Sequence, residues 1–128
     1  MNERKYDGFL PGRHVFEGYG GFGFRFAGMS HRGSVLALPS GIRIWPVTQA
    51  SEITEDSFSA VFAEEPGTIQ HLLVGTGEFL LPIPRVLKDR LRAIGISAEP
   101  MATGAAARTY NILLDEKRLV AAALIAVA

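Results

Sequence analysis

The fold is decided in the second half of the chain, where residues 71–99 read HLLVGTGEFLLPIPRVLKDRLRAIGISAE. The short apolar run at 71–74 predicts a buried strand. Residues 82–93 predict an amphipathic helix, because apolar residues recur on one side while charged residues occupy the other, and Gly95 ends it. Residues 96–99 predict the next strand. Two strands joined by a helix in this way are normally parallel, with a right-handed connection.

The same alternation continues to the end of the sequence. Residues 103–117 predict a second helix, and residues 119–127, LVAAALIAV, form the most hydrophobic stretch of the chain. A membrane-spanning helix needs about 20 apolar residues, which is about twice this length. We therefore interpret the stretch as a buried strand whose alanines permit close contact with a helix. The second half is predicted to be a β-α-β-α-β unit.

The first half has the period of strands. Phe22, Phe24 and Phe26 alternate with glycine and arginine, and short apolar runs follow at 35–38 and 42–45. The intervening segments are too short for crossover helices, so we expect an antiparallel meander. A weak helix is expected near residues 54–64. The whole chain is thus predicted to be an α/β protein, a single compact three-layer domain with a mixed central sheet, whose N-terminal β meander precedes the β-α-β-α-β unit.

Length and the polar start define the expected domain limits. A chain of 128 residues fits one domain. Residues 1–12 are polar and turn-rich, which predicts a flexible N-terminal arm, and residues 13–128 are predicted to form the single α/β domain. The start lacks the apolar run of a secretory signal. We therefore expect a cytoplasmic protein without membrane insertion.

Composition argues against several classes of function. The 13 basic and 13 acidic side chains cancel, whereas nucleic-acid-binding domains are usually basic. The chain has no cysteine, and its three histidines are far apart in sequence, so we expect neither a metal site nor thiol chemistry. Leu80 stands where a dinucleotide-binding glycine would be required. We expect no cofactor and identify no catalytic set, which leaves enzymatic activity open.

Two glycine-bearing loops form a candidate anion-binding cradle. Both are expected at the carboxyl edge of the parallel strands, where α/β folds often hold ligands. Thr103 can cap the second helix, small residues leave further N–H groups accessible, and Arg108 adds a positive charge. Glu78 is the nearby candidate base. The candidate ligand-binding residues are Gly75, Thr76, Gly77, Thr103, Gly104 and Arg108.

The same residues also allow a purely structural interpretation, in which Thr103 is only a helix cap, the glycines serve the turns and Arg108 pairs with Glu78. Four further residues are candidate surface contacts. His31 and Arg32 occupy a polar turn, while Tyr110 and Asn111 lie in the second helix beside Arg108. A solvated turn at 31–32, and bonds from residues 110 and 111 to neighbouring loops, are the alternatives.

Several segments, taken together and in order, resemble a known family. They are Phe24-Arg25-Phe26, His31-Arg32-Gly33-Ser34, Leu38-Pro39-Ser40-Gly41, Val74-Gly75-Thr76-Gly77, Met101-Ala102-Thr103-Gly104-Ala105-Ala106 and Arg108-Thr109-Tyr110-Asn111-Ile112-Leu113-Leu114. Over residues 14–127 the chain is similar to the small α/β family that includes the mitochondrial NADH:ubiquinone oxidoreductase complex assembly factor 3. The resemblance implies a compact three-layer domain and protein partners, among them respiratory complex subunits or another assembly factor.

Two functional hypotheses follow. The first is a non-enzymatic interaction module, an assembly factor for respiratory complex I or for another membrane-associated complex. It predicts an exposed apolar or loop-rich patch, and a homodimer is one form it could take. The second is a protein or enzyme that binds a small anion or metabolite through the Gly75-Thr76-Gly77 and Thr103-Gly104 loops.

Overall fold

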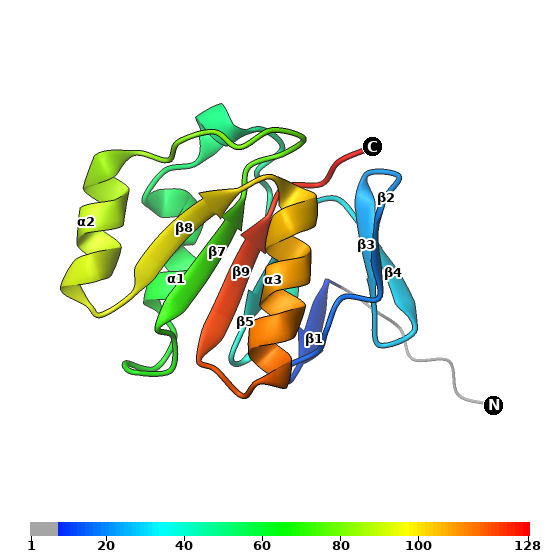
Figure 1. The fold of residues 1–128 in the computed structure, drawn as a ribbon, viewed down its shortest axis with the longest axis horizontal. Coiled ribbons are helices and arrows are strands. Elements are labelled where there is room, and N and C mark those ends of the chain that lie inside the picture. The colour runs from blue at the N-terminus through cyan, green and yellow to red at the C-terminus, as the bar shows by residue number, and fades with distance from the viewer. Residues whose placement is uncertain (1–7) are drawn as a thin grey trace.

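The computed structural model describes residues 8–128. It contains two sheets, three α-helices and two short 3₁₀ turns (Figure 1). The strands are β1 (Phe9–Pro11), β2 (Gly18–Gly20), β3 (Gly23–Phe26), β4 (Met29–Arg32), β5 (Val35–Leu38), β6 (Gly41–Ile44), β7 (His71–Gly75), β8 (Ser97–Met101) and β9 (Val120–Leu124). The helices are α1 (Ser59–Phe62), α2 (Arg85–Ala93) and α3 (Thr103–Asp115), and the 3₁₀ turns span Ala50–Glu52 and Asp56–Phe58.

The main sheet is mixed and has the strand order β1-β6-β5-β9-β7-β8. Strand β7 runs parallel to both β8 and β9, as the β-α-β-α-β prediction requires. Strand β5 pairs antiparallel with β9 and β6, and β1 pairs antiparallel with β6. The C-terminal strand therefore joins the two halves of the chain at the centre of the sheet.

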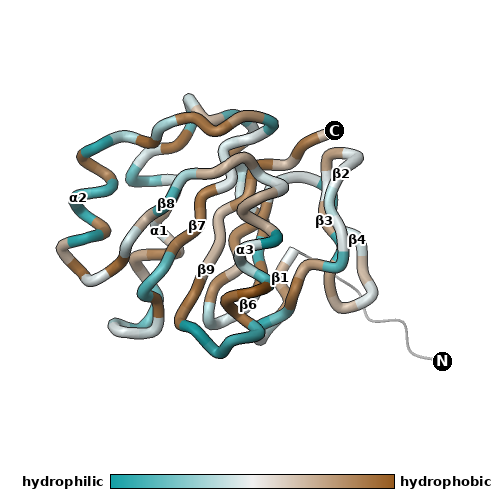
Figure 2. Tube along the Cα trace, in the orientation of Figure 1, coloured by the Kyte–Doolittle hydropathy of each residue, from teal (hydrophilic) through white to brown (hydrophobic). Residues whose placement is uncertain are grey.

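Strand β9 shows why the domain has three layers. All five of its residues are buried, and successive side chains point to opposite faces of the sheet. Ala121 and Ala123 belong to the apolar cluster that α1 and α2 cover, which also contains Leu87 and Leu91. Ala122 lies in the second cluster, beneath α3. The predicted α/β class and mixed central sheet are confirmed, and Figure 2 shows the apolar residues concentrated in the central strands and on one side of α2.

The predicted N-terminal meander is divided between two sheets. Strands β2, β3 and β4 form a separate three-stranded antiparallel sheet, here called the small sheet, while β5 and β6 form a hairpin within the main sheet. The division follows from burial. Every residue of Val35–Leu38 is buried, so β5 requires cover on both faces, whereas β3 buries Phe24 and Phe26 and exposes Arg25 between them.

The limits of the other predicted elements need correction. Residues 1–7 of the expected arm lie outside the described part, but Phe9–Pro11 form β1, and Leu10 is buried in the core. The helix expected at 54–64 is a 3₁₀ turn followed by the single turn α1. Helix α2 begins only at Arg85, because prolines occupy residues 82 and 84. Helix α3 ends at Asp115, before the positive φ of Lys117.

Candidate functional site

The candidate site lies where β7 and β8 end and α3 begins. Two backbone bonds join the loops there: Thr76 N–H donates to Met101 O at 2.8 Å, and Thr103 N–H donates to Gly77 O at 2.8 Å. The structure therefore brings together the two glycine-bearing loops, as their predicted position at the carboxyl edge of parallel strands required. The loops hydrogen-bond directly to each other.

Thr103 uses its hydroxyl to join three segments of the chain. The Oγ1 hydroxyl donates to Ile125 O at 2.8 Å and accepts from Gly77 N–H at 3.0 Å. Ala102 is the N-cap of α3, and no side-chain cap bond is made there, so the predicted capping role of Thr103 is wrong. Because the side chain is completely buried, these bonds hold the first turn of α3 against the loop after β7 and the end of β9.

Thr76 organises the next loop in the same way. Its buried Oγ1 accepts from Leu81 N–H at 3.0 Å and lies 2.7 Å from Phe79 O and 3.1 Å from Met101 O, to either of which it can donate. The loop is thus closed around a hydroxyl group of the protein. This closure turns three consecutive apolar side chains, 79–81, toward solvent.

Two of the three glycines of the candidate cradle, Gly75 and Gly104, allow close packing, whereas Gly77 has open space around it and a positive φ of 114°. A Cβ at Gly75 would lie 3.0 Å from both Thr103 Cα and Leu124 Cδ2. A Cβ at Gly104 would collide with the Tyr19 hydroxyl and would lie 2.8 Å from its Cζ. Neither residue could carry a side chain without a shift of its neighbours.

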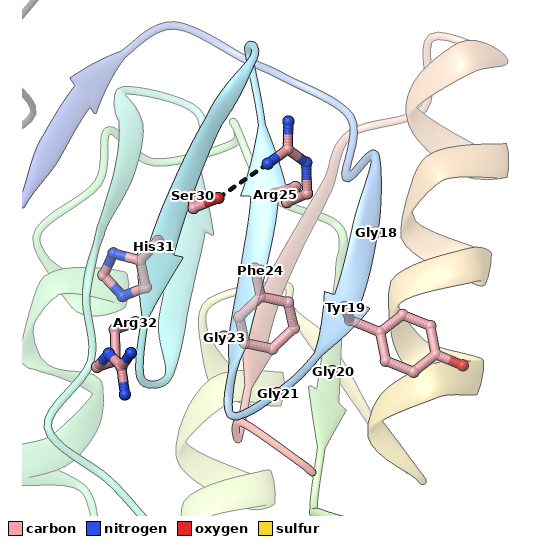
Figure 3. Close-up of a pocket in the computed structure, with 10 residues that line it drawn as sticks. All are labelled: Gly18, Tyr19, Gly20, Gly21, Gly23, Phe24, Arg25, Ser30, His31 and Arg32. Atoms are coloured by element: carbon pink, nitrogen blue, oxygen red, sulfur yellow. Dashed lines mark hydrogen bonds between the residues drawn. The ribbon is translucent and has the colours of Figure 1, made fainter.

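Arg108 completes the contact between α3 and the small sheet. Its guanidinium donates to the Tyr19 hydroxyl at 2.8 Å, and Figure 3 shows Tyr19 directed toward α3. Within residues 8–128 no ion pair joins Arg108 to Glu78, so the expected alternative partner is replaced by Tyr19. The side-chain hydroxyls of Thr76 and Thr103 are thus hydrogen-bonded to other groups of the protein. Tyr19 lies over Gly104.

Two of the four predicted surface contacts are buried. The His31 side chain is 5% exposed, and its Nε2 lies 3.1 Å from Ser34 O. Burial lowers the pKa of the imidazole, and the bond to Ser34 opposes this in part. Tyr110 is completely buried and packs against the Phe16 ring at 5.4 Å. Prediction of these two residues as surface contacts is therefore wrong, because both side chains lie on the inward faces of their elements.

Asn111 is a structural residue and Arg32 is a surface residue. The Asn111 amide donates through Nδ2 to Phe16 O at 2.7 Å and accepts through Oδ1 from Phe16 N–H at 2.8 Å. This pair attaches the segment before the small sheet to α3, as the expectation of a bond to a neighbouring loop indicated. The Arg32 side chain is exposed at the end of β4.

An exposed apolar surface borders the site, and its residues were not among the candidates that the sequence suggested. We call it the apolar edge and define it as Phe22, Phe79, Leu80 and Leu81, which are 60%, 72%, 62% and 45% exposed. Phe22, Phe79 and Leu81 line one shallow depression together with Val127. Tyr19, Phe79 and Arg108 line another.

A signal for the apolar edge was present in the sequence. Residues 79–84 read FLLPIP, an apolar run that two prolines prevent from continuing as a helix. In the structure the run is a loop whose residues 79–81 face solvent, while Ile83 is buried. Figure 2 shows the loop from β7 to α2 as a hydrophobic segment across the top of the molecule.

Comparisons with known proteins agree with this architecture. The family described as "Protein of unknown function (DUF498/DUF598)" matches residues 16–125. The chain belongs to this family. A protein from Rhodobacter capsulatus whose name is given as uncharacterized is 37% identical over 123 residues, which cover 96% of this chain and 90% of that protein. The predicted family resemblance is confirmed.

Another relative carries a functional name. NADH dehydrogenase [ubiquinone] 1 alpha subcomplex assembly factor 3 from Danio rerio is 36% identical over 111 residues, 87% of this chain. The match spans 63% of that protein's length. A crystal structure described as an outer membrane protein from Bartonella henselae superposes with a TM-score of 0.87 at 48% identity, covering 92% of this chain and 98% of that one. Across residues 8–128, no helix has the length and apolar character needed to span a membrane.

Proposed function

We propose that this protein binds another polypeptide through the apolar edge and so helps respiratory complex I, or another membrane-associated complex, to assemble. The observation that carries the proposal is the exposure of Phe79, Leu80 and Leu81 in a loop that internal hydrogen bonds hold. Relatives named as assembly factors support the choice of complex. Under this proposal the protein acts in the cytoplasm, on the side of the membrane where soluble subunits of the complex become available.

The apolar edge has the properties of a binding surface. Monomeric soluble proteins rarely expose large contiguous apolar patches, and a few well-packed side chains near the centre of an interface contribute most of its binding energy. Because Thr76 already fixes the loop, a partner would lose little free energy in ordering it. Arg108 borders the depression that Phe79 and Tyr19 share, which gives the apolar centre a charged rim. The partner that fits this surface is a subunit that still exposes an apolar face. In the finished complex, subunits that join later would cover that face.

The anion-binding alternative has weaker support. The hydroxyl groups of Thr76 and Thr103 are committed to protein atoms, and Tyr19 lies against Gly104. Arg108 already donates to Tyr19. An anion at this place would have to displace Tyr19, so the same residues are better explained as the support of the apolar edge.

The proposal is tested by affinity purification from gently lysed cells of the source organism. Phe79→Ser combined with Leu80→Ser removes the centre of the apolar edge, and Val86→Ser is the matched control, since Val86 is equally exposed but lies on α2. NADH dehydrogenase subunits should copurify with the wild type and the control, and their recovery should fall about ten-fold or more with the double variant.

Three results would count against the proposal. Equal recovery of these subunits with the double variant would remove the apolar edge from the interface. Their absence from the wild-type sample would remove the assembly role. A concentration-dependent dimer that the double variant dissociates would assign the edge to a second copy of this chain.

A further inference from the structure

The two faces of the small sheet differ sharply. The register of its strands places Tyr19, Phe24 and His31 in one cross-strand row, on the face that packs toward α3. The opposite, outward face carries two other rows. They consist of Gly18, Arg25 and Ser30, and of Gly20, Gly23 and Arg32.

The outward face carries glycines between two arginines, and of these glycines Gly18 and Gly20 are half-buried and Gly23 is buried. Three of its six positions are glycines, and a Cβ at Gly23 would collide with the carbonyl oxygen of His31, so this position must remain without a side chain. The result is a depression of about 470 Å³ along the three strands (Figure 3). We call it the glycine platform.

The charge of the platform is positive. The side chains of Arg25 and Arg32 are both exposed, and no acidic residue is among those that line the depression. Within residues 8–128 neither guanidinium forms an ion pair. Arg25 donates through Nη1 to the Ser30 hydroxyl at 2.9 Å, which orients its side chain across the sheet. Guanidinium groups arranged in this way favour carboxylates, with which they form charge-assisted hydrogen bonds.

Strand β4 adds an open hydrogen-bonding edge beside the platform. Among residues 8–128 it is the last strand of the small sheet, and β3 is the one strand of this part that pairs with it. Gly33 N–H donates to Phe22 O at 2.8 Å, and antiparallel bonding alternates from residue to residue. The backbone of His31 therefore faces β3, while the N–H and C=O groups of Ser30 and Arg32 point away from the sheet. Such an edge is a template for another strand.

We propose that β4 binds an extended acidic segment of a partner protein as a fourth strand, with alternate carboxylates beside Arg32 and Arg25. Backbone bonds to Ser30 and Arg32 would supply affinity, and the two guanidinium groups would select acidic side chains. This inference goes beyond the proposed function, because it depends on neither Phe79 nor Leu80.

The test uses the full-length ¹⁵N-labelled protein and synthetic octapeptides in which threonine alternates with glutamate or with lysine. NMR titration gives the affinity, and amide hydrogen exchange reports the new backbone bonds. The glutamate peptide should bind at least ten-fold more tightly than the lysine peptide, and saturation with it should slow exchange at Ser30 and Arg32. Arg25→Gln and Arg32→Gln should each weaken binding about three- to ten-fold, while Arg92→Gln, an exposed substitution on α2, should not.

A third peptide separates strand addition from general attraction of anions. Methylation of alternate backbone nitrogens keeps every carboxylate but removes the donors that a fourth strand needs, so this peptide should neither bind tightly nor protect the two amides. Binding without protection, equal binding of the methylated or lysine peptide, or unchanged affinity in both arginine variants would overturn the proposal. Failure of the glutamate peptide to bind would overturn it as well.

Discussion

Tyr19 lies directly against the backbone of Gly104, so that a Cβ at residue 104 would come within 2.8 Å of Tyr19 Cζ. Arg108, one helical turn further along, donates to the Tyr19 hydroxyl at 2.8 Å. These contacts join the small sheet to the first turn of α3. They also place Tyr19 beside the exposed Phe79, so the inter-sheet contact supports one side of the apolar edge.

Gly104→Ala should therefore lower the free energy of unfolding by about 1 to 3 kcal/mol, because the new methyl group overpacks the Tyr19 contact. In a Tyr19→Ala background the same substitution should be neutral or slightly stabilising, since alanine is a better helix former than glycine. Urea unfolding of the four proteins measures the coupling. An equal effect of Gly104→Ala in both backgrounds would show that the two residues do not interact.

Thr103→Val should lower the free energy of unfolding by about 2 to 3 kcal/mol. The substitution keeps the shape of the side chain but removes the hydroxyl, which leaves Ile125 O and Gly77 N–H without their bond in a buried place. Thr68→Val is the matched control, because the Thr68 hydroxyl bonds to Glu65 O in an exposed turn. If urea unfolding gave similar losses of unfolding free energy for Thr103→Val and Thr68→Val, the central role of the Thr103 hydroxyl would be contradicted.

Local periodicity was sufficient to predict the β-α-β-α-β unit. The apolar face of α2 and the continuous burial of β9 each depend on neighbouring residues in the sequence, and the structure confirms both elements. Prolines and a positive φ shifted the ends of the helices by a few residues. The division of the meander into two sheets could not be predicted in this way, because alternation shows that a strand has an apolar face but not which helix covers it.

The site depends on contacts that are distant in sequence. The hydroxyl of Thr103 bonds to residues 22 and 26 positions away, and Asn111 pairs with Phe16 across 95 positions. Thr103 before a glycine is typical of a helix cap, and only the folded chain shows that its hydroxyl bonds elsewhere. The common position of the two loops at one sheet edge could be predicted, because it follows from the direction of the strands alone. The hydrogen bonds within the loops could be seen only in the tertiary structure.

His31 should make stability depend on pH below neutrality. Burial is the main cause that lowers its pKa from the ordinary value of 6.5, so the unfolded chain binds a proton more readily than the folded one. Stability should therefore be full above pH 6.5 and should fall as the pH drops through the lowered pKa. Urea unfolding between pH 7.5 and pH 5 measures the slope, which His31→Gln should reduce. His14→Gln is the reference variant. If His31→Gln left the dependence of stability on pH unchanged, that dependence would arise from other groups.

Tyr110→Phe should raise the free energy of unfolding by about 1 kcal/mol. The Tyr110 hydroxyl is buried without a hydrogen-bond partner among residues 8–128, and such a group loses its bonds to water when the chain folds. The ring contact with Phe16 needs no hydroxyl and should remain.

Burial also raises the pKa of Tyr110 to about 12, so wild-type stability should fall as the pH rises from 10 toward 12, and the stability of Tyr110→Phe should fall less. Urea unfolding at pH 7 and at pH 11 checks both effects, and a variant less stable than the wild type at pH 7 would show that the hydroxyl is satisfied in solution.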